Sequence, residues 1–180
     1  MSQSAEQQPR IEGARVWLQP FTETDLTPAY LGWLSDPVAT RYSNQRFARH
    51  TRESSLAYLH SFDGSPNFFF SVRRRNDGLA LGTMTAYVAL NHGTADMGIL
   101  IGERSVWGQG YGLDAWSSLL GWLLTERGLR KVTAGTLDCN APMLRLMEKS
   151  GMHAEGARRR QEIVEGAEHD ILYFARFRDD

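Results

Sequence analysis

The feature that most constrains the fold is a glycine-rich turn at residues 107–112, Trp-Gly-Gln-Gly-Tyr-Gly. An apolar run, Met97–Ile101, precedes it, and a long amphipathic run, Leu113–Arg127, follows it. This order predicts a strand, a tight turn and a helix. Alternate glycines leave the backbone N–H groups of the turn uncovered, and the helix adds its unpaired first-turn N–H groups and the positive end of its dipole. The turn is therefore predicted to bind an anion, best a phosphate.

The spacing excludes two familiar phosphate loops. No Gly-Lys-Ser/Thr sequence ends the turn, and its glycines follow GxGxG rather than the GxGxxG of dinucleotide-binding folds. A plain strand-to-helix connection is the alternative to an anion site. The residues beyond the helix favour the anion site, because a predicted strand, Lys131–Leu137, leads to Asn140 and a short helix that ends near Glu148-Lys-Ser-Gly-Met152.

The rest of the chain predicts one mixed, mostly antiparallel sheet with helices on both faces, an α/β (α+β) fold. Helices are expected from Thr22 or Thr24 to Asp36-Pro37, and from Thr51 to about His60. Residues 1–10 are polar and predict a flexible tail, which leaves residues 11–180 as a single domain. The expected further strands are Arg15–Gln19, Asn67–Arg74, Leu79–Leu90, Asp96–Ile101, His153–Ile163 and Ala167–Phe177.

Charge and composition narrow the class of protein. The net charge of −1 gives no reason to expect a nucleic acid or membrane partner. No apolar run reaches transmembrane length and no signal peptide is recognised, so we expect a cytoplasmic protein. The single cysteine, Cys139, excludes an internal disulfide, and the histidines show no metal-binding spacing, so no metal is expected. Arginine runs at 73–75 and 158–160 are interpreted as solvated faces, because alternate strand residues point to opposite sides.

Taken together, Ser105–Gly112, Asn140 and Glu148–Met152 resemble the GNAT superfamily of acetyl-CoA-dependent N-acetyltransferases over about residues 14–177. The resemblance is greatest to the branch of ribosomal-protein-alanine, amino-sugar and polyamine acetyltransferases. It implies a GNAT-like sheet whose central strands splay apart to bind acyl-CoA. Two departures concern the chemistry: a tyrosine that many relatives use as a general acid is Met147 here, and a serine that some carry is Met143.

The resemblance implies acetyl-CoA as the co-substrate. The glycine-rich turn would take its pyrophosphate, and the strand at 99–101 would splay from Val132-Thr133 and pair with the pantetheine arm. Asn140 would hold the far side of the arm, although a plain helix N-cap fits it equally well. Arg104, Arg145 and Lys149 would bind the 3′-phosphate. The expected cofactor-binding residues are Ile99, Leu100, Ile101, Trp107, Gly108, Gln109, Gly110, Tyr111, Gly112, Asn140, Arg145 and Lys149.

The implied reaction is attack of a neutral amine on a thioester, for which in-line positioning supplies much of the rate. A base is needed, because an alkyl amine is mostly protonated at pH 7. Asp96 is the first candidate for that base or for holding the amine, and Glu103 is the second. The alternatives are a solvated edge carboxylate for Asp96 and a surface role for Glu103. Direct transfer is expected, because the sequence shows no obvious base beside Cys139.

Trp33, Tyr42 and Tyr87 are candidate substrate-binding residues, with core packing as the alternative for each. The acceptor is expected to be a small-molecule amine, namely an amino sugar, or a protein N-terminus. The segment Trp33–Pro37 resembles some amino-sugar members. A polyamine or antibiotic acceptor is one alternative, and a non-catalytic acyl-CoA-binding module, suggested by Met147, is another. A homodimer is left open.

Overall fold

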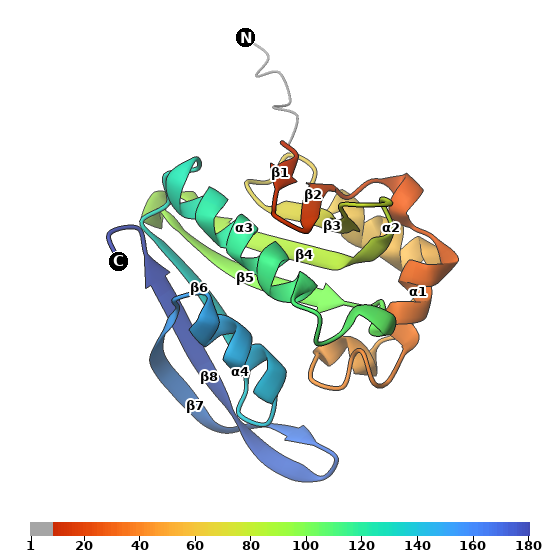
Figure 1. The fold of residues 1–180 in the computed structure, drawn as a ribbon. Helices are drawn as coiled ribbons and strands as arrows, with labels where there is room; N and C mark the ends of the chain where they lie inside the picture. The colour runs from red at the N-terminus through yellow and green to blue at the C-terminus, as the bar shows by residue number, and fades with distance from the viewer. Residues whose placement is uncertain (1–8) are drawn as a thin grey trace.

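The computed structural model describes residues 9–180 and shows an eight-stranded sheet flanked by helices (Figure 1). The strand order is β1-β2-β3-β4-β5-β6-β8-β7, and every neighbouring pair is antiparallel except β5 and β6. The strands are β1 (Ile11–Glu12), β2 (Val16–Pro20), β3 (Phe68–Arg74), β4 (Ala80–Ala89), β5 (Thr94–Ile101), β6 (Lys131–Leu137), β7 (His153–Val164) and β8 (Ala167–Phe177). The predicted mixed, mostly antiparallel sheet is confirmed.

Four α-helices and four 3₁₀ turns complete the described part of the chain. The helices are α1 (Pro28–Ser35), α2 (Arg52–His60), α3 (Tyr111–Thr125) and α4 (Ala141–Lys149). The 3₁₀ turns are η1 (Glu23–Asp25), η2 (Asn44–Phe47), η3 (Leu90–His92) and η4 (Arg104–Val106). The predicted flexible tail at residues 1–10 lies almost wholly outside the described residues.

The first helix differs from its prediction. It was expected to start at Thr22 or Thr24, but α1 begins at Pro28 with Thr27 as its N-cap. Proline suits the first helical position, where its missing N–H costs nothing. The earlier Thr-Asp pattern is used instead by η1, in which the Asp25 carboxylate accepts the Thr22 N–H at 2.8 Å. The cap predicted for α2 is confirmed, since the Thr51 hydroxyl accepts the Ser54 N–H at 3.1 Å.

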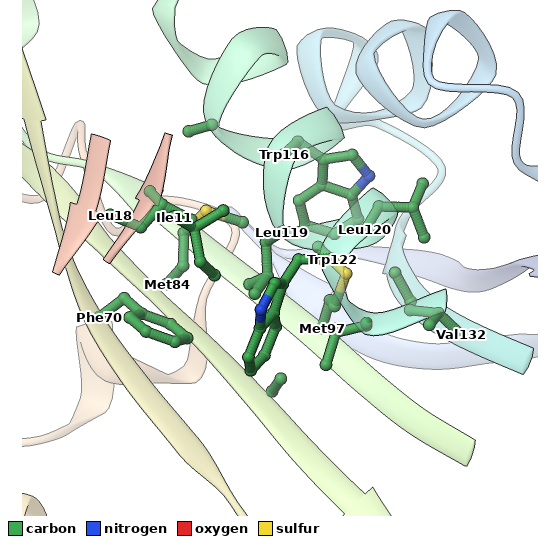
Figure 2. Close-up of a cluster of buried hydrophobic side chains, with 14 of the residues drawn as sticks. Ile11, Leu18, Phe70, Met84, Met97, Trp116, Leu119, Leu120, Trp122 and Val132 are labelled. Atoms are coloured by element: carbon green, nitrogen blue, oxygen red, sulfur yellow. The ribbon is translucent and has the colours of Figure 1, made fainter. Parts of the chain in front are cut away.

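Side chains alternate across the sheet and build two cores. Phe68 and Phe70 of β3 pack with α3 on one face, whereas Phe69 packs with α1 and α2 on the other. The stripe predicted on α3 is fully buried, namely Trp116, Leu119, Leu120 and Leu123. Figure 2 shows the indole of Trp116 and neighbouring apolar side chains of α3 packed above the strands. Helices therefore cover both faces, as predicted.

The arginines of the first run, at 73–75, are tied to nearby acids. Arg74 Nε donates to Asp77 at 2.9 Å, and Arg75 pairs with Glu12 at 2.6 Å. Arg73 departs from the interpretation as a solvated face, because it pairs with Asp25, whose side chain is 2% exposed. Within residues 9–180 no helix combines the length and hydrophobicity needed to cross a membrane.

Candidate active site

The central feature of the sheet is an opening between β5 and β6. Their parallel pairing covers only three positions and ends at Asp96 opposite Thr133. Beyond it, residues 97–101 of β5 pair only with β4, and residues 134–137 of β6 pair only with β8. Figure 1 shows the two strands diverging from this point. The predicted splay of residues 99–101 is present, but Val132 and Thr133 still pair with β5, so on β6 the opening starts at Ala134, two residues later than expected.

The glycine-rich turn lies at the wide end of this opening. Gly108 and Gly110 have φ angles of +74° and +85°, a left-handed conformation that side chains other than glycine rarely adopt, and Gly110 is the N-cap of α3. The indole N–H of Trp107 donates to the carbonyl of Ile101 at 2.8 Å, which ties the turn to the last residue of β5. The turn therefore presents the first N–H groups of a fifteen-residue helix beside the open strand edge.

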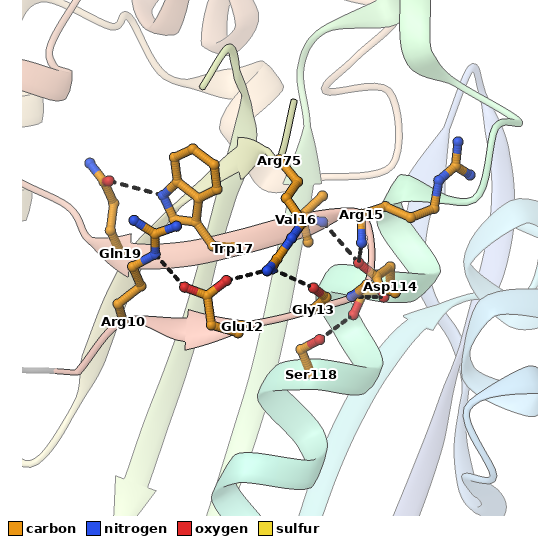
Figure 3. Close-up of polar contacts among 11 residues, drawn as sticks. Arg10, Glu12, Gly13, Arg15, Val16, Trp17, Gln19, Arg75, Asp114 and Ser118 are labelled. Atoms are coloured by element: carbon orange, nitrogen blue, oxygen red, sulfur yellow. Dashed lines mark hydrogen bonds and ion pairs between the residues drawn. The ribbon is translucent and has the colours of Figure 1, made fainter. Parts of the chain in front are cut away.

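Asp114 anchors that helix end to β2 (Figure 3). Its carboxylate accepts three successive backbone N–H groups, from Ala14 at 3.1 Å, Arg15 at 2.8 Å and Val16 at 3.0 Å. A Cβ at Gly13 would lie 2.6 Å from the same carboxylate, so a larger residue there would displace the Asp114 side chain. Sequence reasoning missed this contact, and its one signal was an acid in the first turn of a helix.

Arg15 adds positive charge to the turn. Its guanidinium donates to the carbonyl of Gln109 and lies 4.3 Å from the ring centre of Tyr111. An open cavity of about 320 Å³ lies here, lined by Ala14, Arg15, Arg74, Arg75, Asn76 and Tyr111. Arg145 and Lys149 are exposed one turn apart on α4, whereas Arg104 pairs with Asp36 at 3.5 Å.

The narrow end of the opening carries the candidate base. Asp96 is accessible to solvent, and its carboxylate accepts the Thr133 hydroxyl at 2.8 Å. Desolvation by the surrounding strands raises the pKa of the Asp96 carboxyl, and the hydrogen bond from Thr133 lowers it in part. Tyr87 lies opposite Asp96 on β4, and its hydroxyl is 2.6 Å from that of Tyr58 on α2. Sequence reasoning named Asp96 and Tyr87 but missed Thr133 and Tyr58.

Glu103, the second candidate base, is held in a cap. Its carboxylate accepts the Ser105 N–H at 3.1 Å and also the Ser105 hydroxyl. These hydrogen bonds lower the pKa of the Glu103 carboxyl, which weakens it as a base. The structure therefore favours a local structural role for Glu103 and leaves Asp96 as the stronger candidate.

The far side of the opening is formed by β6 and α4. Asn140 is the N-cap of α4. Its side-chain oxygen accepts the Met143 N–H at 3.4 Å, and its side-chain NH₂ donates to the Thr136 hydroxyl at 3.0 Å. Met147 is fully buried in the main core, and its thioether carries no exchangeable proton, so it cannot act as a general acid. Burial raises the pKa of the Cys139 thiol, the opposite of the shift that activates a nucleophile.

A segment between α1 and α2 bridges the two sides of the opening. Asp36 pairs with Arg104 just beyond β5, and Arg41 pairs with Glu165 at the tip of the β7–β8 hairpin at 2.7 Å. Arg46 adds a hydrogen bond to the carbonyl of Ile163 at 3.2 Å.

The aromatic candidates fall in different surroundings. Trp33 is buried, and its ring lies against Gly102, where a Cβ would overlap it. Tyr42 is half-buried on the bridging segment, with the Arg41 guanidinium 5.3 Å from its ring centre. Tyr87 is 45% exposed beside Asp96, so of the three it is the best placed to contact a substrate.

An open strand edge that leads from a glycine-rich helix entry to a carboxylate is the architecture of an acyl-CoA-dependent N-acetyltransferase. The acetyltransferase (GNAT) domain model matches residues 15–153. The chain therefore belongs to the GNAT family and is an acetyl-CoA-dependent N-acetyltransferase.

Two curated relatives match at low identity. An uncharacterized protein of Methanocaldococcus jannaschii is 24% identical over 162 residues, which are 90% of this chain, and the chain spans only 31% of that relative's length. The uncharacterized N-acetyltransferase p20 of Bacillus licheniformis is 24% identical over 145 residues, 78% of this chain and 81% of that protein.

Solved structures share the fold over nearly the whole chain. A GNAT-family acetyltransferase from Bacillus anthracis has a TM-score of 0.81 at 22% identity, covering 96% of this chain and 100% of that chain. The ribosomal-protein-S5-alanine acetyltransferase from Vibrio fischeri has a TM-score of 0.73 at 16% identity, covering 96% of this chain and 98% of that chain. The spermidine N-acetyltransferase from Vibrio cholerae, solved with CoA and spermine, has a TM-score of 0.79 at 17% identity, covering 92% of this chain and 97% of that chain.

Proposed function

We propose that acetyl-CoA binds along the open edge of β5, with its pyrophosphate at residues 107–112 and its thioester toward Asp96. The observation that carries this proposal is the end of β5–β6 pairing at Asp96 and Thr133. The five residues that follow on β5 have no strand partner on the side facing β6, and they offer about 16 Å of open edge at about 3.3 Å per residue. That edge ends at the glycine-rich turn, so one strand connects the phosphate site with the carboxylate.

The residues of this chain would bind and orient the reactants more than react with them. Bound acetyl-CoA supplies the activated acyl group. Asp96 would hold the acceptor as an ammonium ion and pass its proton to water, while backbone N–H groups of the open edge stabilise developing negative charge. Because partial desolvation by the neighbouring strands raises the pKa of Asp96 and an ammonium partner would lower it, a water relay suits it better than direct proton abstraction.

We further propose that the acceptor carries negative charge near its amine, as an amino sugar on a nucleotide carrier does. The cavity of about 430 Å³ on the bridging segment is lined by Arg46 and Arg49 among other residues, and Arg46 also lies 3.9 Å from the Glu162 carboxylate. Positive charge there would repel a polyamine and attract a phosphate. A protein N-terminus is the second candidate, favoured by the shared fold with the S5-alanine enzyme.

The test is release of free thiol from acetyl-CoA with four acceptors: a nucleotide-linked amino sugar, a peptide with N-terminal alanine, spermidine and an aminoglycoside. We expect the amino sugar to give the highest kcat/KM and Asp96→Asn to reduce it by about 10² to 10⁴-fold. Glu103→Gln is the matched control and should change kcat/KM little. Binding of CoA without thiol release from any of the four amines would overturn the proposed acceptor.

A further inference from the structure

A cluster of three possible metal ligands lies where β6 leads into α4. One ligand atom each from Asp138, Cys139 and His169 lies within 4.8 Å of the other two. Nδ1 of His169 is 2.7 Å from a carboxylate oxygen of Asp138. None of these three residues has a part in the acyl transfer proposed above.

The backbone holds this cluster in place. Asp138 and Asp170 are joined twice, by the Asp138 N–H donating to the Asp170 carbonyl at 3.0 Å and by the Asp170 N–H donating to the Asp138 carboxylate at 3.3 Å. Because Cys139 follows Asp138 and His169 precedes Asp170, these bonds fix the separation of the two chain segments. Asp138 is exposed and the other two residues are half-buried, so an ion can enter from solvent.

We propose that Asp138, Cys139 and His169 bind a divalent transition-metal ion, Zn²⁺ above all. Thiolate, imidazole and carboxylate are the ligands that Zn²⁺ uses, at about 2.0–2.3 Å from the ion, so tetrahedral ligand atoms stand about 3.3–3.8 Å apart. The observed limit of 4.8 Å requires side-chain movements of about 1 Å, well within rotamer adjustment. Water would complete the fourth position, as in three-ligand zinc sites.

Charge balance supports this ligand set. Binding releases the thiol proton to solvent, and the resulting thiolate with the Asp138 carboxylate neutralises the two charges of the ion. The mixed sulfur, nitrogen and oxygen donors disfavour Mg²⁺ and Ca²⁺, which take oxygen ligands. Histidine spacing could not reveal the site, because His169 is thirty residues from Cys139 in the chain and the β6–β8 pairing brings them together.

The site also borders the acyl-CoA opening. Asn140 follows Cys139 directly and caps α4. An ion at the cluster would therefore fix the connection that presents Asn140, without itself contacting the reacting atoms.

Titration of the untagged, reduced protein with Co²⁺ in the absence of oxygen tests the proposal. We expect one equivalent to bind, with a near-ultraviolet thiolate-to-cobalt band and the visible bands of a tetrahedral site, and Zn²⁺ to displace it. Cys139→Ser should abolish the thiolate band. His169→Gln should weaken Co²⁺ binding by at least roughly tenfold, since even outer-shell partners of metal sites contribute that much.

His153→Gln is the matched control, because His153 is an exposed histidine outside the cluster, and it should bind like the parent. Circular dichroism checks that each variant is folded. Absence of the thiolate band in the parent, or equal affinity in the parent and His169→Gln, would overturn the proposal. Neither outcome bears on the acetyltransferase activity, which thiol release measures independently.

Discussion

Asp114→Asn should destabilise the protein and weaken acetyl-CoA binding together, because one carboxylate holds β2 to the start of α3. The substitution preserves shape but removes the charge and one of the two acceptor oxygens that serve the N–H groups of Ala14, Arg15 and Val16. At least one of these groups then loses its partner.

The expected magnitude follows from the number and setting of these contacts. A hydrogen bond to a charged group contributes about 1.5–3 kcal/mol, and these bonds lie at the low end because the site is largely exposed. Loss of charge in the first helical turn adds about 0.3–1 kcal/mol. We expect Asp114→Asn to lower the free energy of unfolding by about 1–3 kcal/mol, and Tm by about 2–12 °C for a chain of this size.

Differential scanning calorimetry measures the first effect, and the KM for acetyl-CoA measures the second. KM should rise more than kcat falls, because the glycine-rich turn leads directly into the helix end that Asp114 positions. Asp63→Asn is the matched control, since the Asp63 side chain is 75% exposed. Equal values of Tm and KM in Asp114→Asn and the parent would refute the reasoning.

Three further predictions concern the proposed site. Partial desolvation raises the folded-state pKa of Asp96, so its negative charge costs stability above the unfolded-state pKa, and that cost fades as pH falls. Asp96→Asn should therefore lose activity at pH 7 without a fall in Tm. The loss in kcat should shrink at high pH, where more of the acceptor is free amine. A drop in Tm would make Asp96 structural. Gly110→Val should abolish CoA binding in calorimetry while the protein stays folded; unchanged affinity would move the phosphate site. Arg145→Ala and Lys149→Ala should each modestly reduce the preference for CoA over dephospho-CoA, and an unchanged preference would place the 3′-phosphate elsewhere.

Local patterns predicted the parts of the fold that depend on neighbouring residues. The buried stripe of α3, the Thr51 cap and the glycine-rich turn all follow from spacing within a few positions. The predicted start of α1 was wrong, because Thr22 and Thr27 both offer helix caps and Pro28 favours a start after Thr27.

Contacts between distant segments were beyond the sequence. Asp114 meets Ala14 a hundred positions away, and His169 meets Asp138 only because β8 pairs with β6. Asp96 was named from its place on a strand, but its partner Thr133 depends on the register of a parallel pair. Hydrogen bonds to Ser105 lower the pKa of Glu103, a local effect that spacing did not reveal.

The most direct test is a crystal structure of the protein with CoA. The pyrophosphate should accept hydrogen bonds from backbone N–H groups of residues 108–112, the arm should lie between residues 97–101 and 134–137, and the sulfur should point toward Asp96. CoA bound elsewhere, with the opening between β5 and β6 filled by protein side chains, would contradict the account.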